Sequence, residues 1–181
     1  MSLCLVGSEM CIRDRVCAGL NPTVISGGVM QNFGQNIYLT NSKYVVVEAD
    51  ESDGTVFQLS PRYLLYLNVD REHIDFYKSY SNFKSKIKKY ILSQNKKDCK
   101  IFINNDDFFL SSLKKYSGNI KTFGSNSDAN YSYKLINLTN KKSSFDFLLG
   151  KKILFKNLST NLLGEHNVCL LYTSDAADER S

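Results

Sequence analysis

Apolar and polar positions along the chain follow two different periods, which predict both strands and helices. Several short apolar runs, bounded by polar or turn-forming residues, have the length of buried strands. In the first run, the Gly-Gly pair at 27–28 predicts a turn at the end of the strand. The predicted strands lie within 21–28, 43–50, 62–69, 100–106 and 120–125.

The segment 79–94 carries the clearest helical pattern. Ser79 or Ser81 would cap its first turn. A second helix is expected at 107–116, and a short helical or irregular turn at 55–61. In the longer helix, the apolar residues recur at i, i+4, i+7 and i+8 and form one buried face: Phe83, Ile87, Tyr90 and Ile91.

From Tyr131 onward the apolar runs are shorter and separated by polar turns, at Asn140–Lys141 and Gly150–Lys151. This pattern predicts an antiparallel meander. Strands that alternate with helices, followed by hairpins, indicate the fold class: α/β, with a mostly parallel sheet flanked by helices and an antiparallel extension. The buried strand positions are expected to be Val45, Val47, Leu65, Leu67, Ile101 and Ile103.

The composition is typical of a soluble globular protein, with 43% hydrophobic and 23% charged residues in 181. No apolar run approaches the roughly 18 residues that span a bilayer. The net charge of +5 comes with lysines dispersed in pairs, which favours a solvated surface over a nucleic-acid interface. Five scattered cysteines without a CxxC pair indicate reduced thiols and a cytoplasmic location.

The two ends differ in composition from the middle of the chain. Residues 1–15 and 169–181 contain no lysine, whereas the interior is rich in lysine and asparagine. Both ends resemble translated sequencing-adapter read-through. We therefore expect them to be non-native and to pack poorly, and we assign residues 16–168 to the functional domain.

Acidic residues follow the predicted strand in "KYVVVEADESDG" directly: Glu48, Asp50, Glu51 and Asp53. The next predicted strand ends in "DREHID", which contains His73. Ligands bind at the carboxyl ends of parallel strands, and carboxylates with an imidazole suit Mg²⁺. We predict that the two strands are neighbours and that Glu48 and His73 converge around two ions about 4 Å apart. The alternative is that these are solvated loop charges and a histidine at a helix start.

Several segments together resemble the Mur ligases in order and spacing: "LNPTVISGG", "GQN", "KYVVVEADESDG", "LNVDREHIDFYKSYSNFKSKI" and "LGEHNV". The resemblance covers residues 16–168 and identifies a partial central ATP-binding domain. It is strongest to members that join L-alanine to UDP-N-acetylmuramate. Murein peptide ligases, with a different run after "EAD", are the nearest alternative.

The resemblance implies ATP-dependent amide-bond formation through an acyl phosphate in peptidoglycan synthesis, with ATP and Mg²⁺ as cofactors. Glu48 matches the Mg²⁺ ligand next to the ATP phosphates, and His73 matches the ligand of a second Mg²⁺. Both are therefore the catalytic and metal-binding candidates. The adenine-contact segment is matched by His166 and Asn167. The substrate-binding candidates are Asn36, Asp50, Glu51 and Ser52.

The chain also departs from the family pattern. It contains no G-x-x-x-x-G-K-[ST] phosphate-binding loop, and Leu170 stands where an asparagine is expected three residues after Asn167. The resemblance therefore implies a fragment that is inactive by itself. Two other classes stay open: a metal-dependent phosphatase that uses the acidic edge, and a nucleic-acid-binding domain built on lysines and tyrosines.

Overall fold

The fold is organised around a single mixed sheet. The computed structural model describes residues 2–4, 12, 15–16, 18–30, 33–95, 98–138 and 142–160. Within these ranges the strand order is β10-β9-β8-β7-β6-β5-β1-β4-β2-β3. The strands are β1 (Ser2–Cys4), β2 (Thr23–Met30), β3 (Gln35–Tyr38), β4 (Val45–Glu48), β5 (Tyr63–Tyr66), β6 (Lys100–Asn104), β7 (Ile120–Gly124), β8 (Tyr131–Leu138), β9 (Ser143–Leu149) and β10 (Lys152–Thr160).

Parallel pairing runs through the centre of the sheet, from β2 to β8. Antiparallel strands close both edges, with β3 on one side and the β8–β9–β10 meander on the other. The α/β fold class with a mostly parallel sheet and an antiparallel extension is therefore confirmed.

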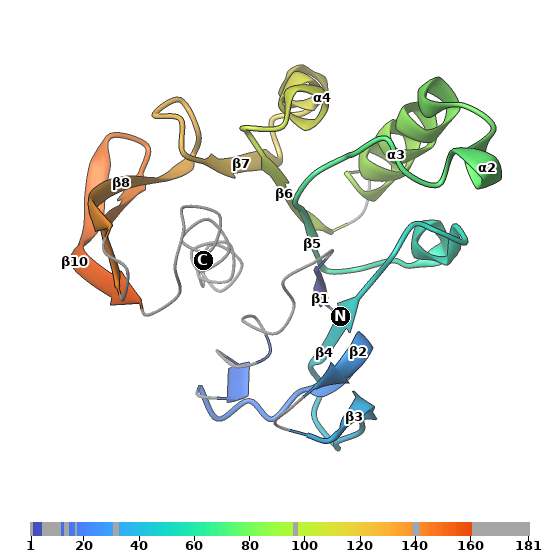
Figure 1. The fold of residues 1–181 in the computed structure, drawn as a ribbon, viewed down its shortest axis with the longest axis horizontal. Coiled ribbons are helices and arrows are strands. Elements are labelled where there is room, and N and C mark those ends of the chain that lie inside the picture. The colour runs from blue at the N-terminus through green and yellow to red at the C-terminus, as the bar shows by residue number, and fades with distance from the viewer. Residues whose placement is uncertain are drawn as a thin grey trace.

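Helices cover one face of the curved sheet, as Figure 1 shows for α2, α3 and α4. The helix α3 begins after Ser79, whose hydroxyl accepts a hydrogen bond from Asn82 N, so the predicted cap is confirmed. The helical elements are η1 (Thr55–Gln58), α2 (Ile74–Tyr77), α3 (Tyr80–Gln94), α4 (Phe108–Ser111) and η2 (Ser112–Tyr116).

Two hydrophobic clusters lie on the two faces of the sheet because successive strand side chains point to opposite sides. Leu64 and Tyr66 join the helix-covered cluster, which contains the buried α3 residues. Leu65 and Leu67 join the opposite cluster, together with aromatic residues of the meander. The predicted core positions are buried, except that Val45 is only partly buried.

The prediction that β4 and β5 are neighbours is wrong. The strand β1 lies between them and pairs in parallel with both. This finding also corrects the expectation that residues 1–15 pack poorly, because Ser2–Cys4 occupy the centre of the sheet and Ile12 and Arg15 are buried. Main-chain pairing requires only an extended segment with free N–H and C=O groups. The unusual composition of residues 1–15 therefore does not prevent Ser2–Cys4 from pairing in the sheet.

Three other details concern turns and ends. The Gly27–Gly28 pair lies inside β2, and the chain turns later, at Phe33–Gly34. The turn expected at Asn140–Lys141 and the segment 169–181 lie outside the described residues. Among the described residues, no helix has the length and hydrophobicity to cross a bilayer.

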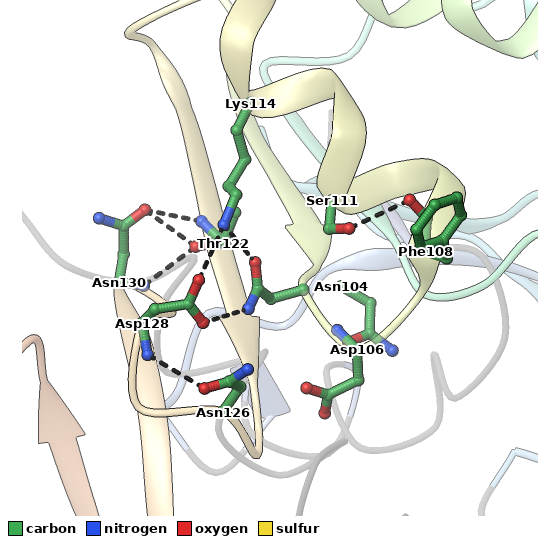
Figure 2. A network of polar contacts seen from close by, with 10 residues as sticks. Asn104, Asp106, Phe108, Ser111, Lys114, Thr122, Asn126, Asp128 and Asn130 are labelled. Carbon is green, nitrogen blue, oxygen red and sulfur yellow. Dashed lines mark hydrogen bonds and ion pairs between the residues drawn. The ribbon is translucent and has the colours of Figure 1, made fainter.

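A polar network ties the ends of β6 and β7 to the connection that leads into β8 (Figure 2). Lys114 Nζ donates to Asn105 Oδ1 at 2.8 Å and lies 3.2 Å from Asp128 Oδ2. Asn105 Nδ2 donates to Asp128 Oδ1 at 2.8 Å. These contacts stabilise the connection between β7 and β8, and β8 is the strand at which the pairing changes from parallel to antiparallel.

We predict that Ile101→Ala lowers the free energy of unfolding by about 2–5 kcal/mol, because it opens a cavity under α3. Ile101 is fully buried at the centre of the helix-covered cluster. Urea denaturation measures the change. Leu39→Ala is the control, since Leu39 is 76% exposed and should change stability by less than about 0.5 kcal/mol. Equal effects of the two substitutions would contradict the core assignment.

A second prediction concerns Gly124, where a Cβ would lie 2.7 Å from Asp106 Oδ1. Gly124→Ala must displace this carboxylate, which accepts a hydrogen bond from Ser125 N at 2.7 Å. We expect a loss of about 1 kcal/mol in thermal or urea unfolding, because the displaced carboxylate gives up its hydrogen bond from Ser125 N. The control Gly118→Ala adds a methyl group in open space and should be close to neutral. If Gly124→Ala unfolds at the same free energy as Gly118→Ala, the Asp106 hydrogen bond does not stabilise the fold at this position.

Candidate active site

Glu48 ends β4 and is held by the neighbouring strand β2. Ser26 Oγ donates to Glu48 Oε2 at 2.6 Å, and Gly27 N donates to the same oxygen at 3.2 Å. The parallel register, in which Ile25 pairs with Val47, places Ser26 beside Glu48 on the same face of the sheet. The carboxylate is therefore fixed at the carboxyl edge of the sheet.

His73 lies in the segment that follows β5, at the start of α2. It has a left-handed backbone with φ of 54°, a conformation that few non-glycine residues adopt. Its Nε2 lies 3.8 Å from Asp50 Oδ1 and 3.8 Å from Glu72 Oε2. The segments that follow β4 and β5 therefore meet at the same edge of the sheet, through Asp50 and His73.

A second contact joins these two segments: the Tyr77 hydroxyl donates to the carbonyl of Glu51. Tyr77 is buried in the helix-covered cluster, and burial raises its pKa to about 12, so the hydroxyl stays protonated at neutral pH. The contact fixes the acidic loop against α2.

Burial also raises the pKa of Glu51 above its ordinary value. The neighbouring carboxylate of Asp50 raises this pKa further, whereas His73 lowers it. Deeper in the core, the Tyr66 hydroxyl is buried without a hydrogen-bond partner among the described residues, and its pKa is raised by burial and by the charge of Glu51. The acidic loop thus carries one carboxylate that is partly withdrawn from water.

The other acidic side chains organise their own loop. Asp50 Oδ1 accepts a hydrogen bond from Ser52 N at 2.7 Å. Asp53 Oδ1 accepts from Thr55 N and Thr55 Oγ1 at 2.8 and 2.7 Å, and these bonds lower the pKa of Asp53. Such side-chain contacts stabilise tight turns, so these residues have a local structural role besides any role in binding.

The structure brings only part of the predicted site together. Glu48 and His73 make no hydrogen bond or ion pair with each other among the described contacts; Glu48 contacts β2, and His73 approaches Asp50. Asn36 is exposed on the edge strand β3, and β2 separates that strand from β4. His166 and Asn167 lie outside the described residues.

The donor set fits Mg²⁺ as a partial site. No group of three His, Cys, Asp or Glu side chains in the described part of the chain is placed to hold a metal. Mg²⁺ characteristically binds one or two protein carboxylates and completes its shell with water and substrate phosphates. Glu48 has one oxygen bonded to β2, and no described residue donates a hydrogen bond to the other. It can therefore offer that oxygen to a cation.

Two sets of supporting residues were not found from sequence. Ser26 and Gly27 donate hydrogen bonds to Glu48. The one sequence signal for this contact is a serine in an apolar strand that ends at the same edge of the sheet as β4. Asp107 Oδ2 accepts from Val69 N at 2.9 Å, and the Tyr80 hydroxyl donates to Val69 O at 2.9 Å. These two bonds anchor the segment that leads to His73, and sequence carries no signal for contacts over such separations.

The family profile described as "Mur ligase middle domain" matches residues 28–169. The chain belongs to the Mur ligase family. The sequence resemblance is therefore confirmed.

Curated relatives of this family support the assignment. The chain is 36% identical over 155 residues to the UDP-N-acetylmuramate–L-alanine ligase of Aquifex aeolicus, covering 83% of the chain and 33% of the relative. The enzyme of the same name from Pelagibacter ubique is 35% identical over 156 residues, covering 82% and 33%. The chain thus spans about a third of the length of these Mur ligases.

Solved Mur ligase structures show the same fold. One is the UDP-N-acetylmuramate:L-alanyl-γ-D-glutamyl-meso-diaminopimelate ligase from Neisseria meningitides, with a TM-score of 0.76 and 19% identity over 96% of this chain and 58% of that one. Another is the UDP-N-acetylmuramate–alanine ligase from Thermotoga maritima, with a TM-score of 0.75 and 22% identity over 95% and 39%.

The raised pKa of Glu51 predicts a pH dependence of stability. The folded state binds the Glu51 proton more tightly than the unfolded state does, in which the pKa of Glu51 is 4.5. The stabilising contribution of Glu51 is therefore complete below pH 4.5 and is lost as the pH rises through the folded-state pKa. Glu51→Gln should remove this loss, so that the variant gains stability relative to wild type as the pH rises. Urea denaturation between about pH 3 and pH 8 measures the difference.

Asp53→Asn is the control with the opposite sign. The pKa of Asp53 is lowered in the folded state. Its contribution to stability is therefore present above the ordinary pKa of 3.8 and is lost as the pH falls through the folded-state pKa. A Glu51→Gln profile parallel to wild type at all pH values would contradict the burial of Glu51.

Proposed function

We propose that the chain is a partial middle domain of an ATP-dependent ligase that joins L-alanine to UDP-N-acetylmuramate in bacterial peptidoglycan synthesis. We assign residues 16–168 to this domain, with Ser2–Cys4 pairing in its sheet, and the enzyme works in the cytoplasm. The observation that carries the proposal is the position of the Glu48 carboxylate, which hydrogen bonds hold at the carboxyl edge of the sheet. At the same edge, Asp50 and His73 bring together the segments that follow β4 and β5. Membership of the family and the names of the curated relatives support it.

The proposed reaction brings two negatively charged groups together. The carboxylate of UDP-N-acetylmuramate attacks the γ-phosphate of ATP, which gives an acyl phosphate and ADP. The amine of L-alanine then attacks the acyl carbon, an amide bond forms, and phosphate leaves. Charge repulsion is the main obstacle, and bound Mg²⁺ would supply the charge neutralisation that both steps need.

In this proposal Glu48 would hold one Mg²⁺ through its second oxygen, and the end of β4 limits the rotation of the side chain. His73, with Asp50 beside its ring, would hold a second Mg²⁺, whose charge would help to neutralise the phosphate groups. Adenine contacts are assigned to His166 and Asn167. The substrate contacts are assigned to Asn36, Asp50, Glu51 and Ser52.

Two alternatives have their own discriminating observation. A murein peptide ligase would use a peptide amine in place of free L-alanine, and its solved relative shares the fold. A metal-dependent phosphatase would release phosphate without any amine. ADP release that requires L-alanine indicates the proposed ligase, and ADP release that requires a peptide amine indicates a murein peptide ligase. Phosphate release without any amine indicates a phosphatase. A nucleic-acid-binding domain would show none of these activities.

The test is a chimera in which residues 28–168 replace the matching segment of the Aquifex aeolicus relative. We expect ADP release that requires both UDP-N-acetylmuramate and L-alanine. Glu48→Ala should lower kcat/KM for MgATP by about a hundredfold or more, because metal charge stabilisation is worth several kcal/mol and each 1.4 kcal/mol is tenfold. His73→Ala should lower kcat more than it weakens nucleotide binding.

The matched control in the chimera is Asp98→Ala, an exposed acidic residue before β6. The isolated chain should not ligate, because its sequence has no P-loop lysine. A folded chimera that is active and indifferent to Glu48→Ala would overturn the assignment of Glu48. Ligation by the isolated chain would overturn the proposal that it is inactive by itself.

A further inference from the structure

We propose that Ser26 is a positioning residue for Glu48: its hydroxyl holds one carboxylate oxygen so that the other is presented to the metal ion. This inference rests on the proposed function. Ser26 is 8% exposed, and it lies on β2, outside the acidic loop. Its Oγ is 2.6 Å from Glu48 Oε2, a distance typical of a strong bond from a hydroxyl to a carboxylate.

The direction of this hydrogen bond follows from its neighbours. Gly28 N donates to Ser26 Oγ at 3.4 Å, so the serine oxygen accepts from the main chain while its proton is available to Glu48. An ionised carboxylate only accepts, which requires the serine to be the donor. Gly27 N adds a second donor to the same Oε2 at 3.2 Å.

Both donors therefore converge on one oxygen of Glu48. Among the described residues, none donates a hydrogen bond to Oε1. The asymmetry restricts rotation of the carboxylate and leaves one oxygen for a cation. Groups that hold a ligand in this way commonly change metal affinity by 10–100-fold when they are removed.

The two glycines that follow Ser26 add no side chain to this part of β2. A Cβ at Gly27 or Gly28 would meet no atom within 4 Å, and both residues are exposed. A pair of parallel strands thus supplies both donors: a side-chain hydroxyl from Ser26 and a main-chain N–H from Gly27. The serine is the one side chain of this group that a substitution can remove without disturbing the main-chain donor.

The experiment titrates the full chain with Mn²⁺, a paramagnetic substitute for Mg²⁺, and follows water-proton relaxation. Ser26→Ala should weaken Mn²⁺ binding by about 10–100-fold. Ser26→Thr keeps the hydroxyl and should bind Mn²⁺ nearly as tightly as wild type does. If Ser26 only filled space, restoring the hydroxyl would not restore Mn²⁺ affinity. Ser132→Ala, which removes another buried serine hydroxyl on β8, is the matched control and should bind as wild type does. Circular dichroism verifies that each variant is folded.

The results separate this inference from the proposed function. If Glu48→Gln abolishes Mn²⁺ binding and Ser26→Ala binds as wild type does, Ser26 has no positioning role and the metal site stands. Equal weakening in Ser26→Ala and Ser26→Thr also overturns the role of the hydroxyl. If Glu48→Gln binds Mn²⁺ as wild type does, the metal role of Glu48 is wrong, and the inference about Ser26 fails with it.

Discussion

The ten strands of the described residues form one sheet because the three residues of β1 pair on both sides. Leu3 lies between Val47 and Leu64, and Cys4 lies between Glu48 and Leu65. Parallel strands at the centre of a sheet must satisfy their main-chain groups on both edges. Without β1, the half of the sheet that carries Glu48 and the half that leads to His73 would have no main-chain bonds across the centre of the sheet.

The inserted strand also sets the width of the candidate site. Neighbouring strands lie about 4.8 Å apart, so β4 and β5 are separated by about 10 Å. This separation is consistent with the absence of a hydrogen bond or ion pair between Glu48 and His73 among the described contacts. The contacts that do cross the gap come from the loops: Asp50 approaches His73, and the Tyr77 hydroxyl bonds to the Glu51 carbonyl.

The two proposed metal ligands are positioned by different means. Glu48 ends a strand, and a neighbouring strand donates two hydrogen bonds to its carboxylate. His73 has a left-handed backbone that is sterically unfavourable for most side chains, and the segment before it is anchored at Val69 by Asp107 and Tyr80. Strain of this kind persists only where the surroundings hold it, and here α3 and α4 supply that support.

Local sequence patterns alone determined the main helix, its cap and most of the buried strand positions. The spacing of Phe83, Ile87 and Ile91, the cap at Ser79 and the short apolar runs depend on neighbours within a few residues, and the structure confirms them. The sequence also predicted that the acidic loop and His73 follow strand ends at one edge of the sheet, and Asp50 and His73 lie 3.8 Å apart there. Their role in binding stays a prediction. Strand order was decided only by tertiary structure, since main-chain hydrogen bonding is nearly independent of side chains and allowed Ser2–Cys4 to enter between β4 and β5. The same holds for Ser26 beside Glu48 and Asp107 on Val69, contacts that join residues 22 and 38 positions apart and exist only once the sheet has formed.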